Sequence, residues 1–135
     1  MAIVTTLGKK INILSLSYTT AADLSALQYC AVIESGAATG KMQITVPGGQ
    51  GVRSVGILQT YNATSGTVGE VLIEGVSNAV ADSTFDSGKE LAISGADGKL
   101  EAAGSGDYVI AIAEEAATEA DQQISVRVVS PYQKN

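Results

Sequence analysis

Few residues of this chain have side chains that could do covalent or acid–base chemistry. The 135 residues include no histidine and a single cysteine, Cys30. Histidine-based general acid–base catalysis, a catalytic triad using histidine and a zinc site of the usual cysteine–histidine kind are therefore excluded. One cysteine cannot form a disulfide within the chain. Cys30 lies beside Tyr29 and the apolar residues 31–33, so we expect a small buried core residue and not a nucleophile.

Two loops share only their composition with ligand-binding motifs. The glycine-rich residues 48–54 lack the Gly-Lys pair and the following helix of a phosphate-binding P-loop, which favours a plain turn. Asp82, Asp86 and Glu90 lack the alternating spacing of an EF-hand calcium loop, which favours a solvated acidic loop. A loosely bound divalent cation at a subunit boundary is the alternative for these acids. We expect no cofactor and no dedicated metal site.

Two further patterns also fail as chemical sites. Glu114 and Glu115 are sequential, and neighbouring residues of a strand point to opposite faces, whereas catalytic carboxylates face one substrate. The tripeptide Asn62-Ala63-Thr64 fits an N-glycosylation acceptor, but nothing in the sequence supports a eukaryotic secretory route. With these candidates set aside, we expect a protein that is not an enzyme.

Charge and hydropathy restrict the partners. The formal net charge is −6, the wrong sign for binding a nucleic-acid backbone. No apolar run approaches the ~20 residues that cross a bilayer, and the first residues do not have the pattern of a secretory signal. We therefore expect neither nucleic acid nor a membrane as a partner. The positive mean hydropathy of this acidic chain indicates that other subunits cover some apolar surface.

Short apolar segments separated by Gly, Ser, Asn and Asp predict an all-β domain. Strands are predicted at residues 55–59, at residues 71–73 continuing to Val76, at residues 108–112 and at residues 124–128. We expect a compact single-domain β-barrel or sandwich of roughly seven to nine short strands. Its core is predicted to include Val32, Ile57, Leu72, Ile73, Leu91, Ile93, Val109, Ile112, Ile124, Val126 and Val128.

A hairpin is predicted where two apolar segments, residues 91–93 and residues 100–102, flank Asp97 and Gly98. This pair suits a type I′ turn, because both central residues of that turn need a positive φ. The hairpin adds two short strands to the predicted sheet.

Helix is limited to one or two short segments. Residues 20–27 offer Asp23 as an N-cap, with Leu24 and Leu27 three residues apart on one face. Residues 114–120 are rich in Ala and Glu, although a loop is an equal alternative there.

Residues 1–18 differ from residues 19–135, which form the predicted β-rich domain. Apolar residues alternate with Thr, Ser and Lys in this segment, and Lys9 and Lys10 are two of only eight basic residues in the chain. Two interpretations stay open. The segment is either the first strand of the barrel or an extended arm that orders on another surface.

Five motifs occur in a recognisable order. They are residues 23–29 with 31–32, residues 55–59, residues 69–71 with 75–76, residues 88–91 with Ser94 and 97–99, and residues 112–117 with 124–126. In order and spacing, over about residues 20–130, the chain resembles phage capsid cement proteins, which are also called head decoration proteins.

The resemblance implies a non-enzymatic β-rich protein on the outer surface of an assembled phage capsid. Such proteins bridge neighbouring major capsid proteins, commonly as homotrimers near local threefold positions. The resemblance places this protein in the virion, after synthesis in the host cytoplasm. The candidate capsid contacts are then Ile3, Leu7, Lys9, Lys10, Ile11 and Ile13 in the first segment, together with Arg53.

Two other functions compete with this one. The first is another virion component, such as a tail-tube or head-fibre subunit, which shares short strands and many small residues. The second is a binding module for a host-surface glycan. Sugar sites usually stack on exposed aromatic side chains, and five Tyr and one Phe offer few of them.

Overall fold

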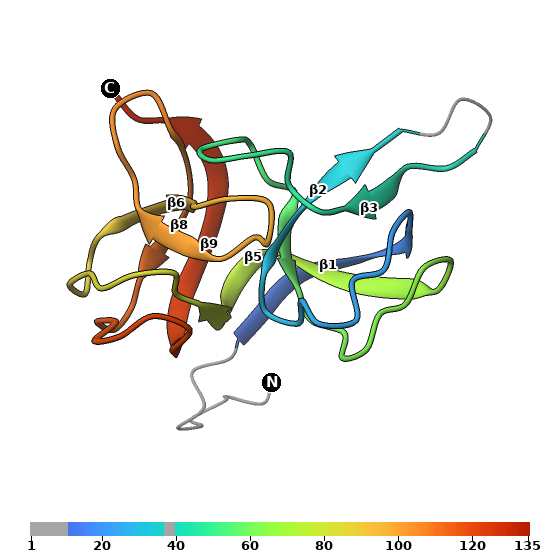
Figure 1. Ribbon diagram of the computed structural model, residues 1–135, viewed down its shortest axis with the longest axis horizontal. Helices are drawn as coiled ribbons and strands as arrows, with labels where there is room; N and C mark the ends of the chain where they lie inside the picture. Colours follow the sequence, from blue (N-terminus) through green and yellow to red (C-terminus); the bar gives the residue numbers. More distant parts are fainter. Residues whose placement is uncertain (1–10, 37–39) are drawn as a thin grey trace.

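The computed structural model describes residues 11–36 and 40–135, and within these ranges the protein is all-β with no helix (Figure 1). The all-β prediction is confirmed. The described residues form nine strands: β1 (Ile11–Thr20), β2 (Ala31–Ser35), β3 (Gln43–Thr45), β4 (Gly56–Leu58), β5 (Val68–Val80), β6 (Glu90–Ile93), β7 (Leu100–Ala102), β8 (Tyr108–Ala113) and β9 (Gln123–Gln133). This part of the chain has no helix long and apolar enough to cross a membrane.

The first half of the chain closes into a five-stranded barrel. The strands follow the order β1-β3-β2-β4-β5, and β5 pairs back with β1 to complete the ring. The closing pair is antiparallel and runs from Ile11 opposite Val76 to Thr19 opposite Val68. Closure is partial on the other side of β1, because β1 and β3 pair only at Thr19 and Thr20.

The second half of the chain continues the same sheet from β5 through β9, β8, β6 and β7. A parallel bridge between Ala81 and Leu100 brings β7 back to the residue that follows β5. These strands therefore curl round a core of their own, on the left of Figure 1, with the barrel on the right. The two halves share the 13-residue strand β5, about 43 Å long at ~3.3 Å per residue.

Each half has its own hydrophobic core, and the strands between them serve both. The barrel core includes Val32, Leu58 and Val71, and the larger second core includes their chain neighbours Ala31, Ile57 and Leu72. Successive side chains of a strand point to opposite faces, so a strand with a core on each side buries adjacent residues. This arrangement explains why these strands are runs of apolar residues without alternation.

The predicted core is largely confirmed. Ile73 and Ile112 are only partly buried, and each packs on the edge of a core cluster. The other predicted residues are buried: Val32, Ile57, Leu72, Leu91, Ile93, Val109, Ile124, Val126 and Val128.

The predicted hairpin is present, but its predicted turn type is wrong. Strands β6 and β7 pair with Ile93 opposite Leu100, so six residues connect them instead of two. Gly98 has a φ of 75°, whereas Asp97 is not among the residues with a positive φ. The connection is longer because it reaches β2, where the carbonyl oxygen of Gly98 accepts a hydrogen bond from the backbone N–H of Ala31 (2.8 Å).

The predicted helix at residues 20–27 is wrong, and of the two alternatives for residues 114–120 the structure has the loop. In residues 20–27, the backbone N–H of Leu24 donates to the carbonyl oxygen of Ala63 (2.8 Å), so contact with a distant loop replaces helical hydrogen bonds. Asp23 still caps a turn, because its side chain accepts from the N–H of Ser25 (3.0 Å). Residues 114–120 form a loop that pairs with the segment after β5, through an antiparallel bridge between Phe85 and Ala117.

Residues 11–18 of the first segment lie in β1 and pair with β5 of the same chain. Residues 1–10 lie outside the described residues. For them, the choice between an arm and an extension of the first strand stays a prediction.

Candidate docking surface

Arg53, the predicted contact residue outside the first segment, is exposed in the loop before β4. Its neighbour Ser54 is buried and fixes this loop. Ser54 Oγ donates to the carbonyl oxygen of Val32 (2.9 Å) and accepts from the backbone N–H of Gly56 (2.9 Å). The side chain of Arg53 therefore extends from a rigid base, which lowers the entropy cost of using it in an interface.

Arg53 lines a groove of about 500 Å³ beside the barrel, which we call the Arg53 groove. Its walls come from β2, from the loop before β4, from β5 and from β9. The lining residues are Ile33, Glu34, Arg53, Ser54, Val55, Ile73, Ser130 and Pro131.

A second groove of about 420 Å³ lies on β5 and β9, and we call it the valine groove. Its lining residues are Glu74, Gly75, Val76, Arg127, Val128, Val129 and Ser130. Ser130 lines both grooves, so they meet at the junction between the barrel and the second half. A concave surface with apolar side chains and charged residues at its rim is typical of a protein docking site.

An irregularity in β9 shapes this junction. Only Ile110 separates Val109 from Ala111 on β8, whereas three residues, 129–131, separate their partners Val128 and Tyr132 on β9. The additional residues bulge out of the ladder, and a proline is tolerated at such a place because it has no N–H to pair. The predicted strand at residues 124–128 stops before this bulge. Pro131 within an apolar and polar run was the signal that could have located it.

The charges at the junction are mixed and exposed. Arg127 Nε lies 3.5 Å from Glu114 Oε2, so this arginine has an acidic partner. Arg53 forms no salt bridge with another described residue. Arg53 is therefore available to an acidic group of a partner.

Of the other predicted capsid contacts, the structure describes the backbone of two. Ile11 and Ile13 belong to β1, and Ile11 lies opposite Val76 of the valine groove in the β1–β5 register. Strand β1 thus runs beside the part of β5 that lines the valine groove. Ile3, Leu7, Lys9 and Lys10 lie outside the described residues.

Three of the carboxylates considered for chemistry contact other groups of the chain, whereas Asp82 and Asp86 are exposed. Glu114 pairs with Arg127, whereas Glu115 Oε1 accepts from the backbone N–H of Ser125 (2.9 Å), so the two acids do not face a common point. Glu90 is a residue of β6, and its carboxylate accepts a hydrogen bond from Tyr132 Oη (2.6 Å). Within the described ranges, no group of three or more acidic or cysteine side chains is arranged to hold a metal ion.

Cys30 is buried, as predicted. Burial raises the pKa of its thiol to about 11, because the thiolate would lose its hydration. A thiol with so high a pKa is a poor nucleophile at neutral pH.

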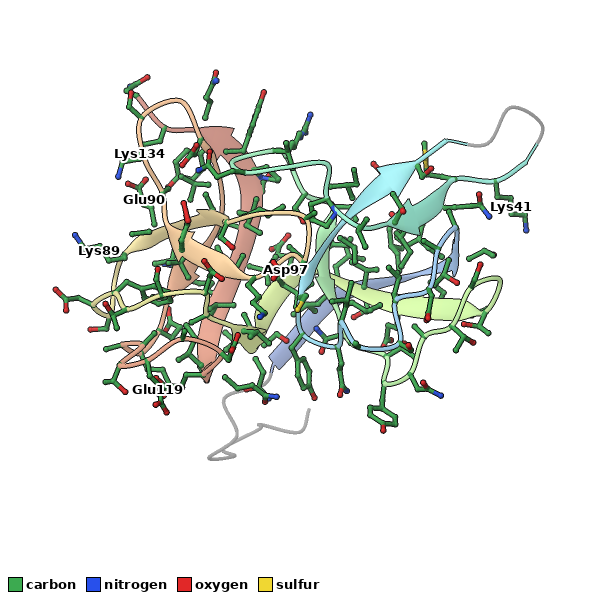
Figure 2. All side chains as sticks on the ribbon, viewed as in Figure 1. Lys41, Lys89, Glu90, Asp97, Glu119 and Lys134 are labelled. Atoms are coloured by element: carbon green, nitrogen blue, oxygen red, sulfur yellow. The ribbon has the colours of Figure 1, made fainter. Side chains whose placement is uncertain are left out.

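A small polar cluster of Glu90, Tyr132 and Lys134 connects β6 with the end of the chain. Glu90 and Lys134 are labelled at the upper left of Figure 2. Lys134 Nζ lies 3.4 Å from Glu90 Oε1, on the carboxylate that Tyr132 also contacts. The hydrogen bond from Tyr132, supported by Lys134, holds the pKa of Glu90 below its usual value. The same contact raises the pKa of Tyr132. The cluster fixes the last residues of β9 on β6.

The described residues thus form a five-stranded barrel with an attached sheet, and two grooves lie where the halves meet. A sequence model of the phage cement protein family matches residues 12–128. The match covers every strand except the first residue of β1 and the end of β9. The chain belongs to the phage cement protein family, and it is a structural protein of a phage virion.

The fold also occurs in a solved structure, the N base of the head fibre protein gp8.5 of bacteriophage phi29. The TM-score is 0.65 with 15% sequence identity, over 86% of this chain and 93% of that chain. This likeness shows a common fold. A comparison with curated protein sequences found no match.

Proposed function

We propose that this protein binds the outer surface of an assembled phage capsid and stabilises it by bridging neighbouring major capsid proteins. Membership of the phage cement family is the observation that carries this proposal. A ligand that binds only the assembled lattice stabilises that state by mass action, and each occupied site adds to the effect.

The proposed contacts lie at the junction of the two halves and in the segment before it. Arg53 and the two grooves offer a charged group and apolar recesses for side chains of the capsid protein. The proposed contacts in the first segment are Ile3, Leu7, Lys9, Lys10, Ile11 and Ile13. The two lysines would meet carboxylates of the capsid.

We also propose that the protein acts as a homotrimer near local threefold positions of the lattice. A threefold arrangement would present three copies of the docking surface to adjacent capsid subunits, and linked sites bind more tightly than single ones. Analytical ultracentrifugation of the free protein, together with a map of decorated heads, measures the state before and after binding.

Binding to purified expanded heads tests the function. The protein should saturate the heads at near-stoichiometric occupancy and raise the temperature at which they release their DNA. Absence of saturable binding to expanded heads would overturn the proposal. Unexpanded shells are the control, because a ligand of the expanded lattice should not bind them.

Arg53 is tested by Arg53→Ala against Lys89→Ala, which removes another exposed cation from the far half of the molecule (Figure 2). Loss of a charge-assisted hydrogen bond should weaken head binding by about tenfold, which corresponds to ~1.4 kcal/mol. The Lys89 variant should bind like the parent protein. Equal binding by both variants would remove Arg53 from the interface.

A second candidate function is the base of a head fibre. The common fold with the base of the phi29 head fibre favours it over a tail or glycan-binding role. In that case a map of the virion would show additional density rising from each copy, whereas a cement protein would end at its own surface.

A further inference from the structure

Strand β1 has a long open edge on the side away from β5. Thr19 and Thr20 pair with Gln43 and Ile44 of β3. Residues 11–18 have no strand partner on that side among the residues that the structure describes. One edge of β1 is therefore open over about eight residues, because β3 pairs only with the last two residues of the strand. The other edge of β1 is paired with β5.

The backbone hydrogen bonds indicate which groups this edge offers. The N–H of Glu70 donates to Thr60 Oγ1 (2.8 Å) and its carbonyl oxygen accepts from the N–H of Gln59 (2.8 Å), so both groups point away from β1. Ser17 lies opposite Glu70. In an antiparallel ladder such a pair directs its N–H and C=O groups outward, so those of Ser17 point to the open edge.

The direction of the backbone N–H and C=O groups alternates from residue to residue along β1. The N–H of Thr20 donates to the carbonyl oxygen of Thr67 (2.9 Å), which places even-numbered residues toward β5. Ser15 therefore shares the outward direction of Ser17. The backbone N–H and C=O groups of Ser15 and Ser17 thus point to the open edge.

Nothing in the composition of β1 protects its edge. Native proteins usually protect an edge with charged residues, proline or a very short strand. The ten residues of β1 include no charge and no proline, and Leu14 and Leu16 are 43% and 45% exposed. By contrast, β7 at the other end of the sheet is only three residues long.

The side chains beside the edge define the chemistry of a partner. Across the strand, Ser17 is small and its neighbour on β5, Glu70, is exposed and has no salt bridge with another described residue. An added strand beside β1 would place one of its residues opposite Ser17. The backbone of that residue would lie two strand spacings, or ~9.6 Å, from the backbone of Glu70, so the side chain of a lysine or arginine there can reach the Glu70 carboxylate. On the other face, Leu16 favours an apolar side chain.

We infer that the open edge of β1 accepts an extended segment of the capsid protein, in which apolar and basic side chains alternate. The inference rests on the proposed capsid function and names the contact that the function would use. Main-chain hydrogen bonds between the segment and β1 would give affinity. An apolar side chain beside Leu16 and a basic side chain near Glu70 would fix the register of the segment on β1.

Ser17→Pro tests the edge. Proline removes the outward N–H of Ser17 and leaves the hydrogen bonds of β1 to β5 intact. The variant should melt within a few degrees of the parent protein and bind expanded heads at least tenfold more weakly. Ser17→Thr keeps the N–H and should bind normally. A folded Ser17→Pro variant that binds like the parent protein would overturn the inference.

If Ser17→Pro fails to fold, Leu16→Lys decides, because the side chain of Leu16 is already half exposed. Unchanged head binding by Leu16→Lys would overturn the inference. Glu70→Gln should weaken binding and reduce its salt dependence. If the parent protein itself does not bind heads, the proposed function fails. If the parent protein and the edge variants bind equally well, only the inference about the β1 edge fails.

Amide hydrogen exchange separates the possible occupants. The Ser15 and Ser17 amides should exchange quickly in the free protein and become at least tenfold slower on heads. Slow exchange in the free protein at all concentrations would assign the edge to residues 1–10 of the same chain. Slow exchange only at high concentration would assign it to a second copy. Either result overturns a capsid segment as the occupant.

Discussion

At the scale of single residues, several polar side chains of the described chain are committed to local structure. Ser54 holds the loop that carries Arg53, and Glu115 caps the start of β9 through Ser125. Arg53 combines a loop held by Ser54 with the absence of an ionic partner among the described residues, and it lines a groove. A residue with these properties is a better candidate for contact with another protein than one already paired.

The Glu90–Tyr132 contact gives a prediction about ionisation. The hydrogen bond from Tyr132 lowers the pKa of Glu90, so Tyr132→Phe should raise that pKa toward its ordinary value. Because the folded pKa is depressed, the contact stabilises the protein above the ordinary pKa of glutamate, and this contribution is lost as pH falls through the folded value. Carbon-detected NMR titration of the Glu90 carboxyl measures the shift.

Tyr61→Phe is the matched control for this titration, since Tyr61 is 77% exposed and donates to no described carboxylate. An unchanged Glu90 pKa in Tyr132→Phe would show that Lys134 alone determines it.

At the scale of elements, strands between the two cores are the distinctive feature. Strand β4 has three residues and all are buried, with Ile57 in one core and Leu58 in the other. We expect Ile57→Ala and Leu58→Ala each to cost about 2–5 kcal/mol of unfolding free energy. Ile124→Ala should cost a similar amount, because Ile124 is buried in the second core. Urea denaturation followed by circular dichroism gives the values.

Val68→Ala is the control for these core variants, because Val68 is 63% exposed and its truncation should change stability by less than ~0.5 kcal/mol. A small cost for either residue of β4 would mean that only one side of this strand packs against a core.

The connection between β6 and β7 gives a second element-scale prediction. Gly98 has a positive φ, and a Cβ atom there would collide with the backbone carbonyl of Ala31. Gly98→Val should therefore cost at least ~2 kcal/mol, from the strained φ and from the collision together. Thermal melting with Gly88→Val isolates the collision, because Gly88 has a φ of 83° and open space around it. Equal costs would show that the contact with β2 adds nothing.

The sequence predicted the strands because alternation and apolar runs are local signals. It failed where distant hydrogen bonds decide the backbone. Leu24 and Leu27 have helical spacing, yet Leu24 pairs with Ala63, and residues 114–120 pair with the loop at Phe85. The grooves could not be predicted, because they depend on which strands meet at Ser130. Arg53 was identified as a candidate, but its neighbours in the groove were not.

At the scale of the whole molecule, β1 joins the first segment to the closed barrel. Deletion of residues 2–17 removes most of the strand that pairs with β5. We expect this variant to lose its cooperative thermal transition, because the barrel opens and Val71 loses its cover. A variant lacking residues 2–10 should keep that transition. Differential scanning calorimetry distinguishes the two.

Head binding by the shorter deletion then tests the arm. A folded variant without residues 2–10 that no longer binds heads supports contacts by Ile3, Leu7, Lys9 and Lys10. Full binding would confine the interface to the described surface. A cooperative melt of the longer deletion would contradict the role assigned to β1.

Sharing β5 between two cores also has a consequence for the fidelity of folding. A slip of β5 by one residue would move Val71 and Leu72 into each other's core and would bring Val68 or Glu70 to the place of Gly69. That place has little room, since a Cβ on Gly69 would lie 3.1 Å from the terminal methyl groups of Ile44 and Leu58. A slipped register is therefore disfavoured both at Gly69 and in the two cores. On a shell with many equivalent sites, every copy would then present the same surface.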